Sequence, residues 1–275
     1  MSSRQPNSVE TLPSGDTVEY YDNIGVDGKP QRRRYTINGV KCDSISTIAS
    51  MMPKDLTSWA YNIGLDAGIK AAELGASDVD TAKIVAKDRK FDMRSVTDKA
   101  SSRGTSAHSE AERMLNEKRV YPWINVSPET ISGYAEAAAK FINKHVEAVV
   151  HTEKIVASRR LNVSGRLDAV CLLKGVRNKP FLSVVDFKTT DRDQNFQIYN
   201  SHIAQLSGYA ICLSESGYEK VNKASIVRLH KNGEFCLHTF SVKPGIFRAC
   251  VKLHEADKQA RKIASQTASL QGLAR

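Results

Sequence analysis

The sequence has no hydrophobic run of 18 or more residues, so no segment is predicted to span a membrane. Its five cysteines include no pair in CxxC spacing, which makes a zinc ribbon or a cysteine-ligated iron–sulfur cluster a poor fit. The phosphate-binding motif GxxxxGK followed by Ser or Thr is absent, so the chain is not expected to be an ATP-driven motor. Residues 1–16 lack the apolar core of a signal peptide. We therefore expect a cytoplasmic protein with reduced thiols.

Positive charge is present in excess. The 275 residues include 40 Lys or Arg and 30 Asp or Glu, a net charge of +10, and 41% of the residues are hydrophobic. This composition predicts a globular chain of one large domain or two small ones. Residues 241–275 hold seven Lys or Arg and two Asp or Glu, so +5 of the charge lies there. A nucleic-acid partner fits this charge, and so does a basic surface that only keeps the protein soluble.

Turn residues and changes of hydrophobic period divide the chain into elements. Two strand-like runs between Val18 and Val40 predict a hairpin, and Asn232-Gly233 predicts another. Helical periodicity predicts helices around Trp59 and at 78–90, 105–117, 129–150, 200–214 and 244–275. Strands are predicted at 154–158, 161–173, 181–188, 224–229 and 234–241.

Three charged side chains carry the predicted chemistry. Asp186 and Lys188 stand at i and i+2 in one strand and therefore point to the same face. Asp168 reaches the same place if its strand pairs with theirs as a hairpin. Two close carboxylates favour a cation, and Mg²⁺ prefers oxygen ligands. A lysine there could orient or deprotonate an attacking water and stabilise charge on a phosphate. An Asp-x-Lys triplet is often only a surface ion pair, but this one ends a strand whose apolar run favours burial.

Four motifs follow one another in a recognisable order. They are Gly104-Thr-Ser-Ala-His108, Gly165-Arg-Leu-Asp168, Val184-Val-Asp-Phe-Lys188 and Gln205-Leu-Ser-Gly-Tyr209. This pattern resembles the RecB-like branch of the PD-(D/E)XK nuclease superfamily, which includes phage exonucleases and mitochondrial genome maintenance exonucleases. The resemblance covers residues 104–209.

The resemblance implies a role for each residue at the centre of the site. Asp168 and Asp186 would be catalytic carboxylates that bind a metal ion, and the backbone carbonyl of Phe187 would be a further ligand. Lys188 would be the catalytic lysine. His108 would complete or flank the metal site.

Other residues lie beside this centre. Gln205 and Tyr209, at i and i+4 on one helix, would position DNA or the catalytic residues, although each could also be a packing residue. Thr189 could meet a phosphate oxygen or serve only turn chemistry. Glu112 could support the upstream histidine or lie on the helix surface. Glu153 could join the site as an acid on the preceding strand, but a surface position is favoured.

The resemblance also implies the fold and its organisation. We expect an α/β fold, in which a mixed sheet flanked by helices forms a restriction-endonuclease-like nuclease core with an added helical region. One integrated domain would have four parts. These are an N-terminal arm with a hairpin at 1–43, a helical region at 44–150, the core sheet at 151–243 and a basic helix at 244–275.

The implied function is metal-dependent hydrolysis of phosphodiester bonds from DNA ends, in replication, recombination or repair. Mg²⁺ or Mn²⁺ is the expected cofactor, with no iron–sulfur cluster and no other bound group. Single- or double-stranded DNA is the expected partner, and a recombinase or single-strand-binding protein stays open. A phage-encoded enzyme would act in the cytoplasm of a bacterial host. The alternatives are a structure-specific or restriction-like endonuclease and a non-catalytic DNA-binding recombination partner.

Overall fold

The computed structural model describes residues 5–24, 30–53, 57–126, 132–175, 179–190 and 198–273. Within them, nine strands join in one sheet in the order β1-β2-β3-β4-β6-β7-β8-β9, and β5 pairs with β6 outside this path. The strands are β1 (Ser8–Thr11), β2 (Thr17–Ile24), β3 (Pro30–Ile37), β4 (Val40–Ser44), β5 (Val146–Ser158), β6 (Val163–Leu173), β7 (Phe181–Thr190), β8 (Lys223–His230) and β9 (Phe235–Ser241).

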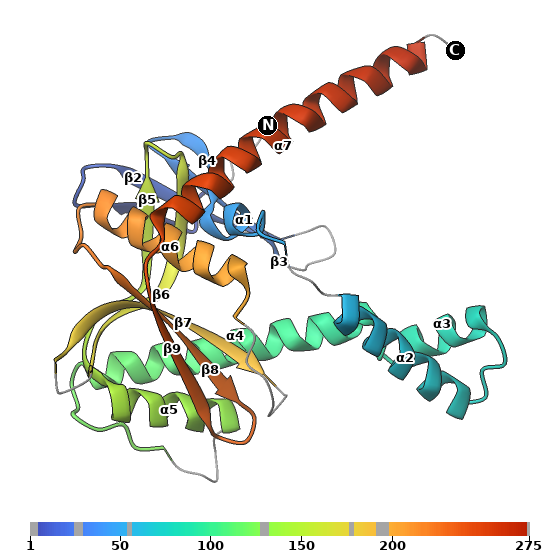
Figure 1. Ribbon diagram of the computed structural model, residues 1–275, viewed down its shortest axis with the longest axis horizontal. Coiled ribbons are helices and arrows are strands. Elements are labelled where there is room, and N and C mark those ends of the chain that lie inside the picture. The colour runs from blue at the N-terminus through green and yellow to red at the C-terminus, as the bar shows by residue number, and fades with distance from the viewer. Residues whose placement is uncertain are drawn as a thin grey trace.

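Helices cover both faces of the sheet (Figure 1). They are α1 (Ile45–Ala49), α2 (Thr57–Glu73), α3 (Val79–Asp88), α4 (Met93–Lys118), α5 (Gly133–His145), α6 (Asn200–Glu215) and α7 (Pro244–Leu273). One apolar cluster joins α4 and α5 to the sheet through residues such as Phe141 and Phe187. A second joins α1, α6 and the start of α7 through Leu206 and Phe247. The α/β class expected from the sequence, a mixed sheet flanked by helices, is confirmed.

The N-terminal strands extend the core sheet. Strands β1 to β4 form an antiparallel meander, and β4 then pairs in parallel with β6 through Asp43 and Val163. The hairpin expected between Val18 and Val40 is present as the β2–β3 pair. Its turn, at 25–29, and the side chains of Arg32 and Arg33 lie outside the described part of the chain.

The central strands bring the predicted site residues to one place. Strands β6 and β7 are antiparallel, and Ala169 pairs with Val185. Continued by one residue, this register sets Asp168 opposite Asp186. Strand β8 runs parallel to β7 and then turns into β9 as an antiparallel hairpin. Gly233 has a φ of 85° in that turn, a conformation that glycine adopts without strain, so the hairpin expected at Asn-Gly is confirmed.

The helix expected at 129–150 is shorter than predicted. Helix α5 ends at His145, and β5 begins at Val146 and continues to Ser158. Closely spaced β-branched residues, including Val149 and Val150, favour a strand, and pairing with β6 satisfies their backbone groups. The strand expected at 154–158 is therefore the second half of a longer one.

Most of the other helices follow their predicted signals, and α4 is the exception. Asp78 caps α3 by accepting hydrogen bonds from the backbone of Asp80 and Thr81. Helix α4 begins twelve residues before the expected start at 105, and α6 and α7 begin at the expected residues. Four cysteines are buried, and Cys236 is half-buried.

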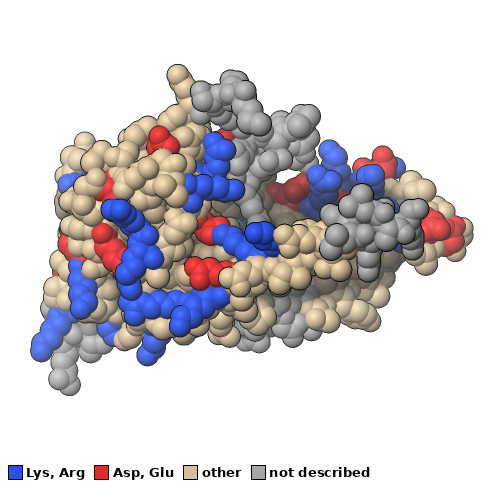
Figure 2. Space-filling view, turned by 90° about the horizontal axis from the view of Figure 1, so that it is seen from above, with Lys and Arg blue, Asp and Glu red and all other residues tan. Residues whose placement is uncertain are grey.

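Two parts project from the body of the molecule. Helices α2 and α3 pack on each other beyond the N-terminal end of α4, and α7 continues away from the sheet (Figure 1). Residues 259–267 of α7 are all exposed. Lys258 and His254 contact Asp43 and so fasten α7 to the end of β4. On the face in Figure 2, Lys and Arg cover more of the body than Asp and Glu do. No described helix is long and apolar enough to cross a membrane.

Candidate active site

Two adjacent strands, β6 and β7, carry the side chains that we call the charged cluster: Asp168, Asp186 and Lys188. Asp168 and Arg166 are the only half-buried residues between Val163 and Cys171 in β6, where all the others are buried. Asp186 is 3% exposed and Lys188 is half-buried in β7. An ionised side chain in such surroundings requires a partner of opposite charge or a hydrogen bond, because burial disfavours its charge.

Asp168 is held by two contacts from different elements. Its Oδ2 lies 3.2 Å from His108 Nδ1 and accepts a 2.9 Å hydrogen bond from the backbone N–H of Phe187. Burial acts to raise the pKa of Asp168, but the imidazole, the Lys188 ammonium and this N–H outweigh it and lower the pKa below its ordinary value. Asp168 is therefore a carboxylate whose charge the fold stabilises.

His108 responds to the same pairing. Burial acts to lower the pKa of His108, but the charge of Asp168 outweighs it and raises the pKa above the ordinary value. Its ring stands edge-on to Phe187 at 6.3 Å between centroids. Ala107 and Ala111 are buried on the same helix and seat α4 against the sheet. The fold therefore brings His108 to Asp168 by packing α4 over β7.

Asp186 and Lys188 form the other half of the cluster. Lys188 Nζ lies 2.7 Å from Asp186 Oδ2. Burial raises the pKa of Asp186, and the neighbouring ammonium reduces this rise without cancelling it. Burial acts to lower the pKa of Lys188, but Asp186 and Asp168 outweigh it and raise the pKa above its ordinary value. Lys188 is thus an ammonium paired with Asp186 and also stabilised by the charge of Asp168.

Helix α6 packs on the face of the sheet opposite to α4 and contributes Gln205 and Tyr209. Gln205 Nε2 donates a 3.3 Å hydrogen bond to Tyr209 Oη, as their i, i+4 spacing allows. Tyr209 is 6% exposed, and burial raises the pKa of its phenol. A Cβ on Gly165 would lie 3.0 Å from Tyr209 Cε1 and 3.2 Å from Ile45. The glycine of the Gly165–Asp168 motif therefore lets the tyrosine ring approach β6 closely.

The threonines after Lys188 differ in their surroundings. Thr190 is buried, and its Oγ1 accepts a 2.6 Å hydrogen bond from Arg228 of β8. Thr189 is half-buried, and its Oγ1 would lie 3.8 Å from a Cβ on Gly104 of α4. Thr189 therefore lies where α4 meets β7, on the same side as His108. Residues 191–197 lie outside the described part of the chain.

The oxygen atoms of this cluster suit a hard cation. Asp186 Oδ2 is buried and, although Lys188 Nζ is near, the contact lacks the geometry of a hydrogen bond, so this oxygen accepts none in the described structure. Carboxylate oxygens are the ligands that Mg²⁺ and Mn²⁺ prefer. No group of three or more described His, Cys, Asp or Glu side chains is placed to hold a metal ion. The fit therefore rests on the two aspartates and on backbone oxygen.

Glu153 and Arg166 stand closer to the cluster than the sequence indicates. Glu153 Oε2 lies 2.8 Å from Arg166 Nε, and the two side chains are 24% and 30% exposed. Burial raises the pKa of Glu153, and Asp168 and Glu112 add to this rise. The surface position expected for Glu153 is thus replaced by a half-buried one. Only the pairing of β5 with β6 brings it there, and no local motif signals it.

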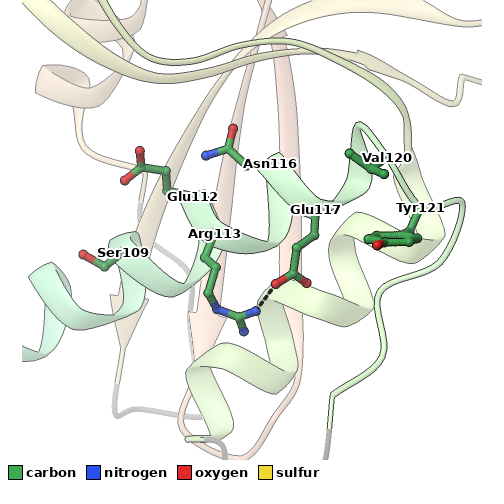
Figure 3. Close-up of a pocket in the computed structure, with 7 residues that line it drawn as sticks. All are labelled: Ser109, Glu112, Arg113, Asn116, Glu117, Val120 and Tyr121. Atoms are coloured by element: carbon green, nitrogen blue, oxygen red, sulfur yellow. Dashed lines mark hydrogen bonds and ion pairs between the residues drawn. The ribbon is translucent and has the colours of Figure 1, made fainter.

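An open groove of about 560 Å³ runs along the outer side of α4. Figure 3 shows its lining, which extends from Ser109 and Glu112 to Tyr121, with Arg113 bonded to Glu117. The groove begins one residue after His108, but neither aspartate nor Lys188 lines it. The charged cluster therefore lies beside this groove rather than in it.

Residues 85–275 match the PD-(D/E)XK nuclease superfamily. This match spans more than half of the chain, so the chain belongs to that superfamily.

Two solved structures show distant likeness. The crystal structure of SSO0001 shares 18% identity over 38% of this chain and 48% of its own, with a TM-score of 0.25, so the chain spans about half of that protein's length. An alkaline exonuclease (LHK-Exo) from Laribacter hongkongensis shares 11% identity over 82% of this chain and 93% of its own, with a TM-score of 0.36. A comparison with curated proteins finds no match.

Proposed function

We propose that this protein is a divalent-metal-dependent DNA exonuclease that hydrolyses phosphodiester bonds from DNA ends. The observation that carries the proposal is the meeting of Asp168, Asp186 and Lys188 on two paired strands. The four sequence motifs resemble those of RecB-like exonucleases, and this resemblance supports action from ends. Replication, recombination or repair, in a phage-type context, is the setting that it favours.

The proposed metal ion would be held mainly by oxygen atoms. Asp168, Asp186 and the backbone carbonyl of Phe187 would hold Mg²⁺ or Mn²⁺, and His108 would flank or complete the set. When bound, such an ion lowers the pKa of a coordinated water and neutralises charge on the phosphate. His108 orients Asp168 through the contact between Nδ1 and Oδ2.

Lys188 is assigned to electrostatic stabilisation. Its pKa is raised above its ordinary value, so the ammonium keeps its proton at neutral pH. A protonated amine donates hydrogen bonds but cannot accept a proton from water. In this state the ammonium can stabilise the negative charge that develops on the phosphate. A bound cation would share the same carboxylates and lower this pKa, so orienting or deprotonating the water stays open as a second role.

The remaining predicted residues surround the substrate path. Gln205, Tyr209 and Thr189 would position DNA next to the cluster. Exposed basic residues of α7, such as Arg248 and Lys252, would contact phosphates. We propose that the four stretches of the chain act as one nuclease domain, which is consistent with the single sheet. A recombinase or single-strand-binding partner stays a prediction.

End-labelled DNA tests this proposal. Linear single- and double-stranded DNA should release short labelled products with MgCl₂ or MnCl₂ and none with EDTA, while circular single-stranded DNA should remain intact. Lys188→Ala should abolish release and keep DNA binding. Lys140→Ala, which removes a surface ion pair of α5, is the matched control and should leave the rate unchanged.

Two outcomes would contradict the proposal. Cleavage of the circle would favour an endonuclease of the same superfamily. Binding without metal-stimulated cleavage would favour a non-catalytic DNA-binding protein.

A further inference from the structure

Glu153 has an unfavourable backbone conformation beside the charged cluster. Its φ is 46°, in the left-handed region that a residue with a Cβ rarely adopts, and it lies within strand β5. The register pairs Thr152 with Ala169 and Lys154 with Leu167, so Glu153 stands opposite Asp168. Like charges directly across a strand pair destabilise a sheet. A glutamate at this position therefore does not stabilise the fold through its backbone conformation or through this neighbour. Residues with such unusual backbone angles concentrate at functional sites.

Arg166 is the contact that compensates Glu153. It stands two residues from Asp168 and is therefore the diagonal neighbour of Glu153, whose Oε2 lies 2.8 Å from Arg166 Nε. The contact is an ion pair without hydrogen-bond geometry, because Nε has no hydrogen-bond partner in the described structure. The guanidinium also lies over the ring of Tyr20, 5.5 Å from its centroid. Two elements, β5 and β2, thus hold this side chain in one place.

The placement of Arg166 relative to Asp168 suits a nucleic-acid strand. Both are half-buried in a run of buried residues, so they face the same side of β6. Two positions along a strand are about 7 Å apart, a step similar to that between consecutive phosphates of an extended nucleic-acid strand. A guanidinium with 30% of its side chain exposed retains donors for a phosphate oxygen.

We propose that Arg166 binds a phosphate of the DNA strand next to the phosphate that is hydrolysed, and that Glu153 is the positioning residue that holds it there. This inference rests on the proposed nuclease site at Asp168 and Asp186. In this inference Glu153 positions Arg166, and Arg166, the arginine of the Gly165–Asp168 motif, binds a phosphate of the substrate.

Linear DNA with one methylphosphonate, a neutral replacement for a single phosphate, tests the inference. The replacement is moved one position at a time around the cleavage point, and KM and kcat are measured with MgCl₂. For the wild-type protein we expect one position next to the cleaved phosphate to raise KM about tenfold or more. Arg166→Ala should raise KM by a similar factor on unmodified DNA and should no longer respond at that position.

Glu153 is tested through the same profile. Glu153→Gln removes the ion pair and should weaken the response at that position while kcat changes little. Arg166→Lys keeps the positive charge but loses the paired N–H donors of the guanidinium, so it should keep part of the response that Arg166→Ala loses. Arg160→Ala, which removes an exposed Arg–Glu pair with Glu215 at the far end of β5, is the matched control and should behave as wild type.

The outcomes separate this inference from the proposed function. If the wild-type protein cleaves with MgCl₂ and Arg166→Ala keeps its KM and its full methylphosphonate profile, the inference is wrong and the nuclease site stands. If the wild-type protein shows no metal-dependent cleavage, the proposed function itself fails. A rise in KM at every position alike, with a lowered thermal midpoint, would mean that Arg166 only supports the fold and would overturn the inference.

Discussion

The two halves of the site are assembled in different ways. Asp186 and Lys188 belong to one strand, and their contact needs only the alternation of side chains along β7. Asp168 meets His108 only because α4 packs over the sheet, 60 positions earlier in the chain. The fold also treats their charges differently, because it lowers the pKa of Asp168 and raises that of Asp186. Local strand geometry thus brings Asp186 and Lys188 together, and tertiary packing stabilises the charge of Asp168.

The largest expected effect is on kcat, and it differs between Lys188 and His108. Lys188→Ala should lower kcat roughly 100- to 1,000-fold, because it removes a charge aimed at the reacting phosphate. His108→Ala should lower it roughly 10- to 100-fold, since this imidazole acts through Asp168. Initial rates on linear DNA at saturating MgCl₂ measure both. A larger loss for the histidine variant would reverse the comparison.

The second prediction concerns the two carboxylates. Asp168→Asn should lower the free energy of unfolding by about 1–3 kcal/mol, because it removes a charge that His108 and the Phe187 N–H stabilise. Asp186→Asn should cost less, because burial already disfavours the charge of Asp186. Urea unfolding in EDTA at pH 7 compares them. Equal losses would mean that the two environments do not differ in the way their pKa directions indicate.

The third prediction follows from the raised pKa of His108. Folding favours the protonated imidazole, so its contribution is fully present below the ordinary pKa of 6.5 and is lost as pH rises through the higher folded value. The stability gap between wild type and His108→Gln should therefore be larger at pH 5.5 than at pH 9. Thermal unfolding in EDTA at both pH values measures it. A gap that widens with pH would contradict the pairing with Asp168.

The smallest expected effect lies on α6. Tyr209→Phe removes one hydrogen bond with Gln205 and keeps the ring against Gly165, so KM should change about 2- to 10-fold. Steady-state kinetics with linear DNA measure the change. A loss of kcat as large as that of Lys188→Ala would move Tyr209 from positioning into the reactive centre.

Much of the fold follows from local patterns. Turn residues and hydrophobic periodicity predicted the β2–β3 and β8–β9 hairpins and the starts of α3, α6 and α7. The boundary at His145 was wrong because helical periodicity continues into residues whose β-branched side chains favour a strand. Strands β1 and β4 were not predicted, because such short segments gain their stability from pairing with neighbours.

Local sequence patterns sufficed to indicate the superfamily and to place Asp186 and Lys188 together. Asp186 and Lys188 share a face because side chains alternate along a strand, and the order of the four motifs indicated the family. Only the tertiary structure decided which charges the site stabilises and what stands around it. Glu153 stands opposite Asp168 through the pairing of β5 with β6, and Arg166 lies over Tyr20, which belongs to a strand far earlier in the chain. Those contacts depend on strand register and packing, which are set only when the sheet forms.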